Sequence, residues 1–121
     1  MIETTKDMIS VWMGTSLKTS DEFNKYTDGM EDSDSHCPAF ADFGVSFIDS
    51  DFFVAFQTDD GEIVPVEVIK DIVKVAKEKG INEGNSLYYY SNAIFYEENP
   101  GRLYNDLKFI GTFKDQRKKF R

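Results

Sequence analysis

Histidine and cysteine, which supply many protein nucleophiles and zinc ligands, are almost missing from this chain. Its 121 residues include one histidine, His36, and one cysteine, Cys37, and the two are adjacent. A structural zinc site needs four ligands, and a catalytic nucleophile needs a base within hydrogen-bond reach, so this pair supplies neither arrangement. The glycine-rich P-loop and the dinucleotide fingerprint are also absent. The sequence therefore predicts no metal, no cofactor and no catalytic residue.

Long apolar runs and paired cysteines are absent as well. No apolar segment approaches the roughly 18 residues that a transmembrane helix needs, so we expect no membrane span. The first residues, MIETTKDMISVW, place acidic side chains early and offer no basic region before an apolar core, so we expect no signal peptide. A single cysteine cannot form an internal disulfide, which favours a reducing compartment. These features together predict a cytoplasmic protein.

Basic residues are nearly missing from one part of the chain. Thirteen carboxylates lie between Thr19 and Ile69 against a single basic residue, Lys25, whereas the remainder of the chain has more basic than acidic residues. The net charge of the whole chain is −8. Such a field repels nucleic acid and speeds association with a basic partner, although an acidic surface can also serve solubility alone. We therefore expect no nucleic-acid binding and, if there is a partner, a basic one.

Apolar periodicity and turn residues predict an α+β fold in a single domain, residues 1–121. We expect a small mixed or antiparallel sheet of about four strands packed against two to three helices. Strands are predicted over residues 8–13, 45–48, 87–97 (as one strand or two) and 107–113. The strand at 8–13 is apolar on both alternating faces, which is typical of an internal strand. Residues 52–56, FFVAF, fit either a strand or a short helix.

Three helices are predicted from capping residues and apolar spacing. The first begins with Ser20 as its cap and ends at Asp28 and Gly29, the second covers residues 39–43, and the third covers residues 65–80. The basic tail at residues 114–121, KDQRKKFR, matches no element and is expected to fray.

Residues 40–56, FADFGVSFIDSDFFVAF, combine six phenylalanines with unpaired aspartates. Aromatic side chains favour burial and carboxylates favour water or a cation, so one face of this stretch should enter the core while the other presents negative charge. Asp49 and Asp51 fit a carboxylate pair for acid–base chemistry or metal-dependent hydrolysis. They also fit an ordinary turn or surface pair, which the pattern favours.

Five short motifs occur in an order that resembles a known family of bacterial inhibitors. The motifs are VWMGT at residues 11–15, EFNKY at 22–26, FADFG at 40–44, DSDFF at 49–53 and KFIGTF at 108–113. In these motifs the chain resembles the immunity-protein family numbered twenty-two of bacterial polymorphic toxin and contact-dependent inhibition systems. It departs from that pattern at Val54 and Ala55, where an acidic residue is expected.

The resemblance implies that the protein is not an enzyme but an immunity protein. Such a protein binds the toxic C-terminal domain of a cognate effector, often a nuclease, and covers its basic active site in the cytosol. We expect the acidic residues to form the partner-binding surface. The candidates are Asp49, Asp51, Asp59, Asp60 and Glu62, with Asp32 and Asp34 as second choice. The alternatives are a small metal-dependent hydrolase using Asp49 and Asp51, or an acidic adaptor domain.

Overall fold

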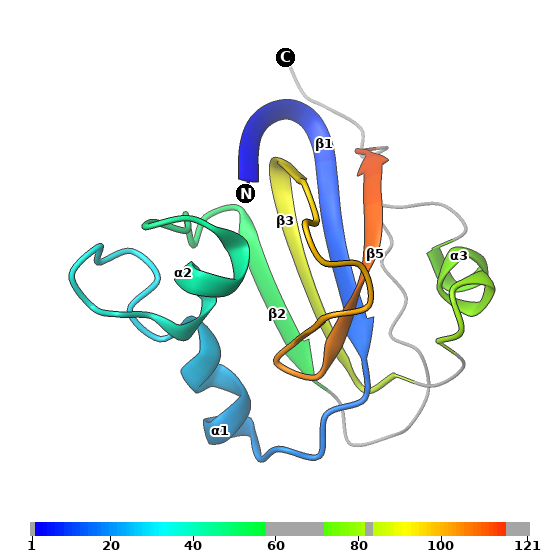
Figure 1. Cartoon of the computed structure of the whole chain (residues 1–121), viewed down its shortest axis with the longest axis horizontal. Helices are drawn as coiled ribbons and strands as arrows, with labels where there is room; N and C mark the ends of the chain where they lie inside the picture. The colour runs from blue at the N-terminus through cyan, green and yellow to red at the C-terminus, as the bar shows by residue number, and fades with distance from the viewer. Residues whose placement is uncertain (1, 58–71, 82–83, 116–121) are drawn as a thin grey trace.

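Five antiparallel strands form one curled sheet at the centre of the molecule (Figure 1). The structure is a computed structural model and describes residues 2–57, 72–81 and 84–115. The strand order along the sheet is β2-β3-β1-β5-β4. The strands are β1 (Ile2–Gly14), β2 (Phe53–Gln57), β3 (Ser86–Phe95), β4 (Leu103–Tyr104) and β5 (Leu107–Lys114). The predicted α+β single domain is confirmed.

The strand β1 lies in the middle of the sheet and pairs with β3 on one side and β5 on the other. Ile9, Val11 and Met13 are buried on one face of β1, and Trp12 is buried on the other. The prediction of an internal strand at residues 8–13 is therefore confirmed, since β1 pairs on both sides and both of its faces are covered. The strand is longer than predicted and runs from Ile2 to Gly14. Near Asp7, whose φ is 68°, β1 bends, and its first residues turn back over the sheet in Figure 1.

The strand β3 forms the predicted aromatic segment as one strand rather than two. It runs without a break from Ser86 to Phe95, although Asn92 has a φ of 58°. Asparagine tolerates this left-handed conformation better than most residues do. The Asn92 side-chain oxygen accepts a hydrogen bond from the Asp7 backbone N–H at 3.3 Å. The irregular positions of the two paired strands therefore lie together, at the bend of β1.

The first helical segment consists of α1 (Ser20–Asn24) and the 3₁₀ turn η1 (Lys25–Thr27). Its cap is Thr19 rather than the predicted Ser20. The Thr19 hydroxyl accepts the Glu22 backbone N–H at 3.2 Å, and the Glu22 carboxylate accepts the Thr19 backbone N–H at 3.1 Å. This reciprocal capping box satisfies two backbone donors, which a cap at Ser20 with Phe23 three residues later would not do.

The second helix, α2 (Pro38–Phe43), begins with proline in its first turn and ends at Gly44, whose φ is 70°. Both ends agree with the sequence prediction. The strand predicted at residues 45–48 is absent, because the Ile48 backbone N–H donates to Met30 O at 2.7 Å instead of joining the sheet. The ambiguous segment that follows is a strand, since β2 begins at Phe53 and pairs with β3.

Two clusters of buried side chains cover the two faces of the sheet. The aromatic cluster lies on the face covered by α1, η1 and α2; its buried rings are Trp12, Phe23, Tyr26, Phe43, Phe53, Tyr88, Phe95 and Tyr104. The aliphatic cluster lies on the opposite face, beneath α3 (Ile72–Glu78); it consists of Ile9, Val11, Met13, Ala76, Leu87 and Ile110. The sheet is thus packed on both sides.

The helix α3 is the described part of the helix predicted over residues 65–80. The preceding turns of that prediction lie outside the described residues. After α3 the chain turns at Gly80, whose φ is 89°, and the Ile81 backbone N–H donates to Ala76 O at 2.9 Å. This is the glycine-containing C-terminal turn expected from the sequence. The tail predicted over residues 114–121 begins too early, because Lys114 is the last residue of β5 and the buried Asp115 donates its backbone N–H to Asp7 O at 2.7 Å. Residues 116–121 lie outside the described residues.

No helix in the described part of the chain is long and apolar enough to cross a membrane.

Candidate functional site

Two acidic segments that are separated in the sequence lie side by side next to α2. One is the loop of residues 28–34 and the other is the turn of residues 49–52. The Glu31 carboxylate joins them, since it accepts the Ser50 backbone N–H at 3.3 Å and the Ser50 hydroxyl at 2.9 Å. We call the surface formed by both segments the acidic surface; its carboxylates are Asp28, Glu31, Asp32, Asp34, Asp49 and Asp51.

The loop of residues 28–34 is built from consecutive hydrogen-bonded turns. The Asp32 backbone N–H donates to Gly29 O at 3.0 Å, and the Asp32 carboxylate accepts the Asp34 backbone N–H at 3.0 Å. The Ser35 hydroxyl donates to Gly29 O at 2.7 Å and closes the loop. The carboxylates of Asp28 and Asp34 accept none of these bonds and are exposed. The backbone thus fixes the loop while leaving these two side chains free to contact a partner.

The two aspartates of the turn at residues 49–52 have different environments. The half-buried Asp49 carboxylate accepts the Asp51 backbone N–H at 2.9 Å, and the Asp49 backbone N–H donates to the Tyr90 hydroxyl at 2.9 Å. Asp51 is exposed. The pair therefore lies in a turn and not on an extended segment, and Asp49 is partly committed to holding that turn. Asp51 is the residue of the pair that is available to a partner.

The described residues contain no group of three or more histidine, cysteine, aspartate or glutamate side chains placed to hold a metal ion. The adjacent His36 and Cys37 point to different environments: His36 is exposed, while Cys37 is buried and its thiol donates to Tyr26 O at 3.3 Å.

The charge of the acidic surface is not balanced by basic side chains of the described chain. The two ion pairs found among residues 2–57, 72–81 and 84–115 are Lys18–Asp106 and Arg102–Asp42, and neither includes a carboxylate of this surface. Exposed carboxylates close together repel one another and create a negative potential in the solvent nearby. The surface therefore attracts cations from outside the molecule.

Two phenylalanines are exposed beside these carboxylates. Phe47 is 50% exposed and Phe52 is 41% exposed, whereas the neighbouring Phe43 and Phe53 are buried in the aromatic cluster. The expectation that this stretch has a core face and a charged face is therefore correct, but the charged face also carries aromatic rings. Exposed aromatic rings near charged groups are a common composition for a protein-binding surface.

Four of the predicted partner-binding residues lie on the acidic surface. They are Asp32, Asp34, Asp49 and Asp51, so the first-choice pair and the second-choice loop form one surface. The other three, Asp59, Asp60 and Glu62, lie outside the described residues.

Sequence reasoning missed the contribution of Glu31 and of the exposed rings of Phe47 and Phe52. Nothing in the sequence signals the bond between Glu31 and Ser50, because it joins residues 19 positions apart through a loop. Phe47 lies in the segment at residues 45–48 that does not join the sheet, and Phe52 lies in the turn before β2; no local pattern indicates that either ring is exposed.

Compared with protein-family models, curated proteins and solved structures, the chain gives no match in any of the three. What it does must therefore be inferred from its own residues and surface.

Proposed function

We propose that this protein is an inhibitor that binds a basic protein domain through the acidic surface, as an immunity protein binds its cognate toxin. One observation carries the proposal: two acidic segments are fixed side by side through Glu31 and Ser50, without a basic partner among the described residues. The resemblance of five sequence motifs to an immunity-protein family supports the same class of partner. The proposed place of action is the cytosol.

The chemistry of the acidic surface suits the active site of a nuclease. Such a site is basic because it must bind phosphates, and carboxylates occupy the same positions by offering similar oxygen acceptors. Long-range attraction between the two surfaces raises the association rate, which matters when a toxin must be neutralised quickly. Phe47 and Phe52 supply apolar area that the partner can bury, and buried aromatic side chains commonly contribute much of the binding free energy at an interface.

The residues that carry the resemblance mainly support the fold. Trp12 and Phe43 are fully buried and their ring centroids lie 4.8 Å apart. Gly44 ends α2 with a positive φ, and Gly111 has a φ of 148° within β5. We infer that these motifs define the scaffold, while recognition of a particular toxin depends on the acidic surface.

Charge reversal of Asp34 and Asp51 tests the proposal. Both carboxylates are exposed and accept none of the hydrogen bonds that hold the loop or the turn. The partner to use is the toxin domain that the proposal expects to be encoded beside this gene. With that domain, the Asp34→Lys, Asp51→Lys double variant should associate about tenfold more slowly or worse, as measured by stopped-flow mixing at low salt.

The matched control is the Glu3→Lys, Glu78→Lys double variant. It changes the net charge by the same amount at exposed positions of β1 and α3, outside the acidic surface. Its association rate should stay within about twofold of the parent protein. Equal loss in both double variants would show a general charge effect, and no loss in either would refute binding through the acidic surface.

A further inference from the structure

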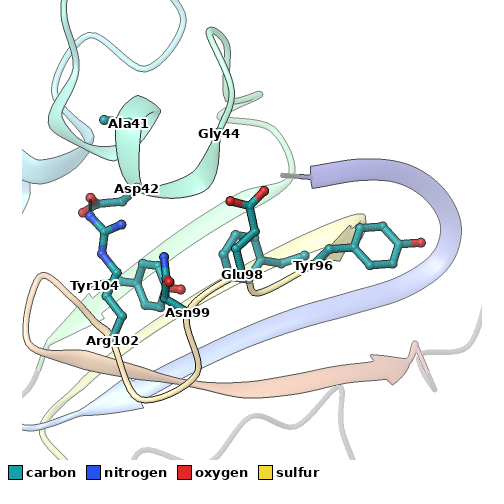
Figure 2. A pocket seen from close by; sticks show the side chains of 9 residues that line it. Ala41, Asp42, Gly44, Tyr96, Glu98, Asn99, Arg102 and Tyr104 are labelled. Atoms are coloured by element: carbon teal, nitrogen blue, oxygen red, sulfur yellow. Dashed lines mark hydrogen bonds and ion pairs between the residues drawn. The ribbon is translucent and has the colours of Figure 1, made fainter.

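A cavity of about 290 Å³ opens between α2 and the segment that links β3 to β4 (Figure 2). The rings of Phe95 and Tyr104 line it, Asp42 borders it from α2, and Glu98 and Arg102 border it from the linking segment. None of the carboxylates of the acidic surface lines this cavity. In Figure 1, α2 lies between the segment that links β3 to β4 and the loop of residues 28–34. The cavity is therefore a separate feature of the same side of the sheet.

One wall of the cavity is fixed by a chain of charged and polar contacts. Arg102 pairs with one oxygen of the Asp42 carboxylate, and the Tyr26 hydroxyl donates to the other oxygen at 2.6 Å. The Arg102 guanidinium also lies 5.8 Å from the centre of the Tyr104 ring. The linking segment turns just before, where the Arg102 backbone N–H donates to Asn99 O at 3.1 Å. These contacts within the chain hold the wall in place.

The charge that remains in the cavity is negative. Arg102 and Asp42 neutralise each other, while Glu97 and Glu98 form no ion pair within the described ranges. Glu97 accepts the Tyr104 hydroxyl at 3.1 Å, and the exposed Glu98 extends its carboxylate toward the Gly44 end of α2 in Figure 2. A free carboxylate thus stands over aromatic walls.

We propose that this cavity receives one basic side chain of a protein partner, with arginine as the better fit. The identity of the partner as a basic toxin domain rests on the proposed function above. An arginine has an apolar stem that packs on rings and a planar guanidinium that binds a carboxylate through two hydrogen bonds. Glu98 receives the guanidinium, and the rings of Phe95 and Tyr104, which line the cavity, contact the stem.

The proposal gives the partner a second anchoring point. The acidic surface attracts a basic domain over a distance, whereas a cavity with one free carboxylate selects a side chain of particular length and shape. The two sites make different contributions: the first mainly sets the association rate, and the second mainly sets the dissociation rate.

The cavity can be tested without the partner by titrating the protein with N-acetyl-arginine amide and following backbone amide signals by NMR. Saturable shifts should appear at Tyr96, Glu98 and Asn99, with a dissociation constant on the order of millimolar. N-acetyl-citrulline amide has nearly the same shape without the charge, and it should produce no saturable shift at the same concentrations. N-acetyl-glutamate amide, an anionic probe, should likewise not bind.

Two variants that each remove one negative charge distinguish binding of the probe in the cavity from general electrostatic attraction to the protein. Glu98→Gln should weaken binding of the arginine probe by about fivefold, whereas Asp34→Asn, on the acidic surface, should leave it within about 1.5-fold. Equal weakening by both variants, equal binding of citrulline, or binding of the anionic probe at Arg102 would each overturn the proposal. The probe titration contains no toxin domain, so its failure would count against the cavity proposal alone. The inhibitor proposal is tested separately by the charge-reversal variants.

Discussion

The two faces of the sheet are packed by different kinds of side chain. The aromatic cluster contains tyrosines whose hydroxyls reach polar partners, as Tyr26 reaches Asp42 and Tyr88 reaches Asn105. In the described residues, the buried members of the aliphatic cluster carry no ionisable group. The acidic surface and the cavity are both built on elements that cover the aromatic cluster. We infer that this face links stability to partner binding, whereas the aliphatic face contributes to stability alone.

The largest expected effect that separates the two faces is alkaline unfolding. Burial raises the pKa of Tyr26, with a further contribution from its bond to Asp42, and burial also raises the pKa of Tyr88. Burial, together with the negative charge of Glu97, raises the pKa of Tyr104 to about 12. A tyrosine in the unfolded chain has a pKa near 10, so above that pH the unfolded chain releases protons that the folded chain retains.

The free energy of unfolding should therefore be insensitive to these groups below about pH 10 and fall from there through about pH 12. The slope should reach about 1.4 kcal/mol per pH unit for each such tyrosine. Urea unfolding at several pH values in this range measures the slope. In the Tyr104→Phe variant the slope should be smaller by the contribution of one tyrosine, about 1.4 kcal/mol per pH unit at most. A free energy of unfolding that stays constant up to pH 12 would contradict the assignment.

The next effect in size is the loss of the ring at the centre of the aromatic cluster. Phe43 is fully buried, and its ring lies within 6.4 Å, centroid to centroid, of five other aromatic rings, including Trp12 at 4.8 Å and Tyr104 at 5.7 Å. Phe43→Ala should lower the free energy of unfolding by about 3–5 kcal/mol, because it removes buried area and leaves a cavity. Chemical denaturation measures this change. Phe43→Leu is the control that keeps most of the volume, and an equal loss in both variants would contradict a role based on packing.

The sequence predicts the scaffold better than the binding features. The strand at residues 8–13, the helix at 39–43 and its end at Gly44 follow from local patterns. The Thr19 cap also had a local signal, the spacing to Glu22, which indicates a capping box. The missing strand at residues 45–48 had none, because its geometry depends on a bond to Met30 O across a loop.

The sequence predicts the composition of the candidate sites but not their geometry. The density of aspartates indicates which segments are acidic, but the contact between Glu31 and Ser50 depends on how the loop and the turn fold onto α2. The cavity depends on the pairing of Arg102 with Asp42, 60 positions apart in the sequence. Long-range pairs of this kind leave no periodic pattern, so they become visible only in the folded molecule.

A smaller effect should come from the Tyr26 hydroxyl, which connects the aromatic cluster to the cavity. Tyr26→Phe removes its bond to the Asp42 carboxylate and should lower the free energy of unfolding by about 2 kcal/mol. Because Asp42 then keeps Arg102 as its one partner among the described residues, the cavity wall should loosen and the arginine probe should bind more weakly. Tyr88→Phe is the control, since its hydroxyl bonds to Asn105 away from the cavity. If Tyr88→Phe weakens binding of the arginine probe as much as Tyr26→Phe does, the proposed link from Tyr26 through Asp42 to the cavity is wrong.

The smallest effect should come from a conservative change on the aliphatic face. Ile110 is fully buried in the aliphatic cluster, and Ile110→Val removes a single methylene group, which should lower the free energy of unfolding by about 1 kcal/mol. The dissociation constants for the proposed toxin partner and for the arginine probe should not change, because Ile110 belongs to the cluster on the opposite face and does not line the cavity. Both constants are measured at a temperature where the variant is fully folded. If either dissociation constant changes while the variant is fully folded, packing on the aliphatic face also affects binding. The division of roles between the two faces would then be wrong.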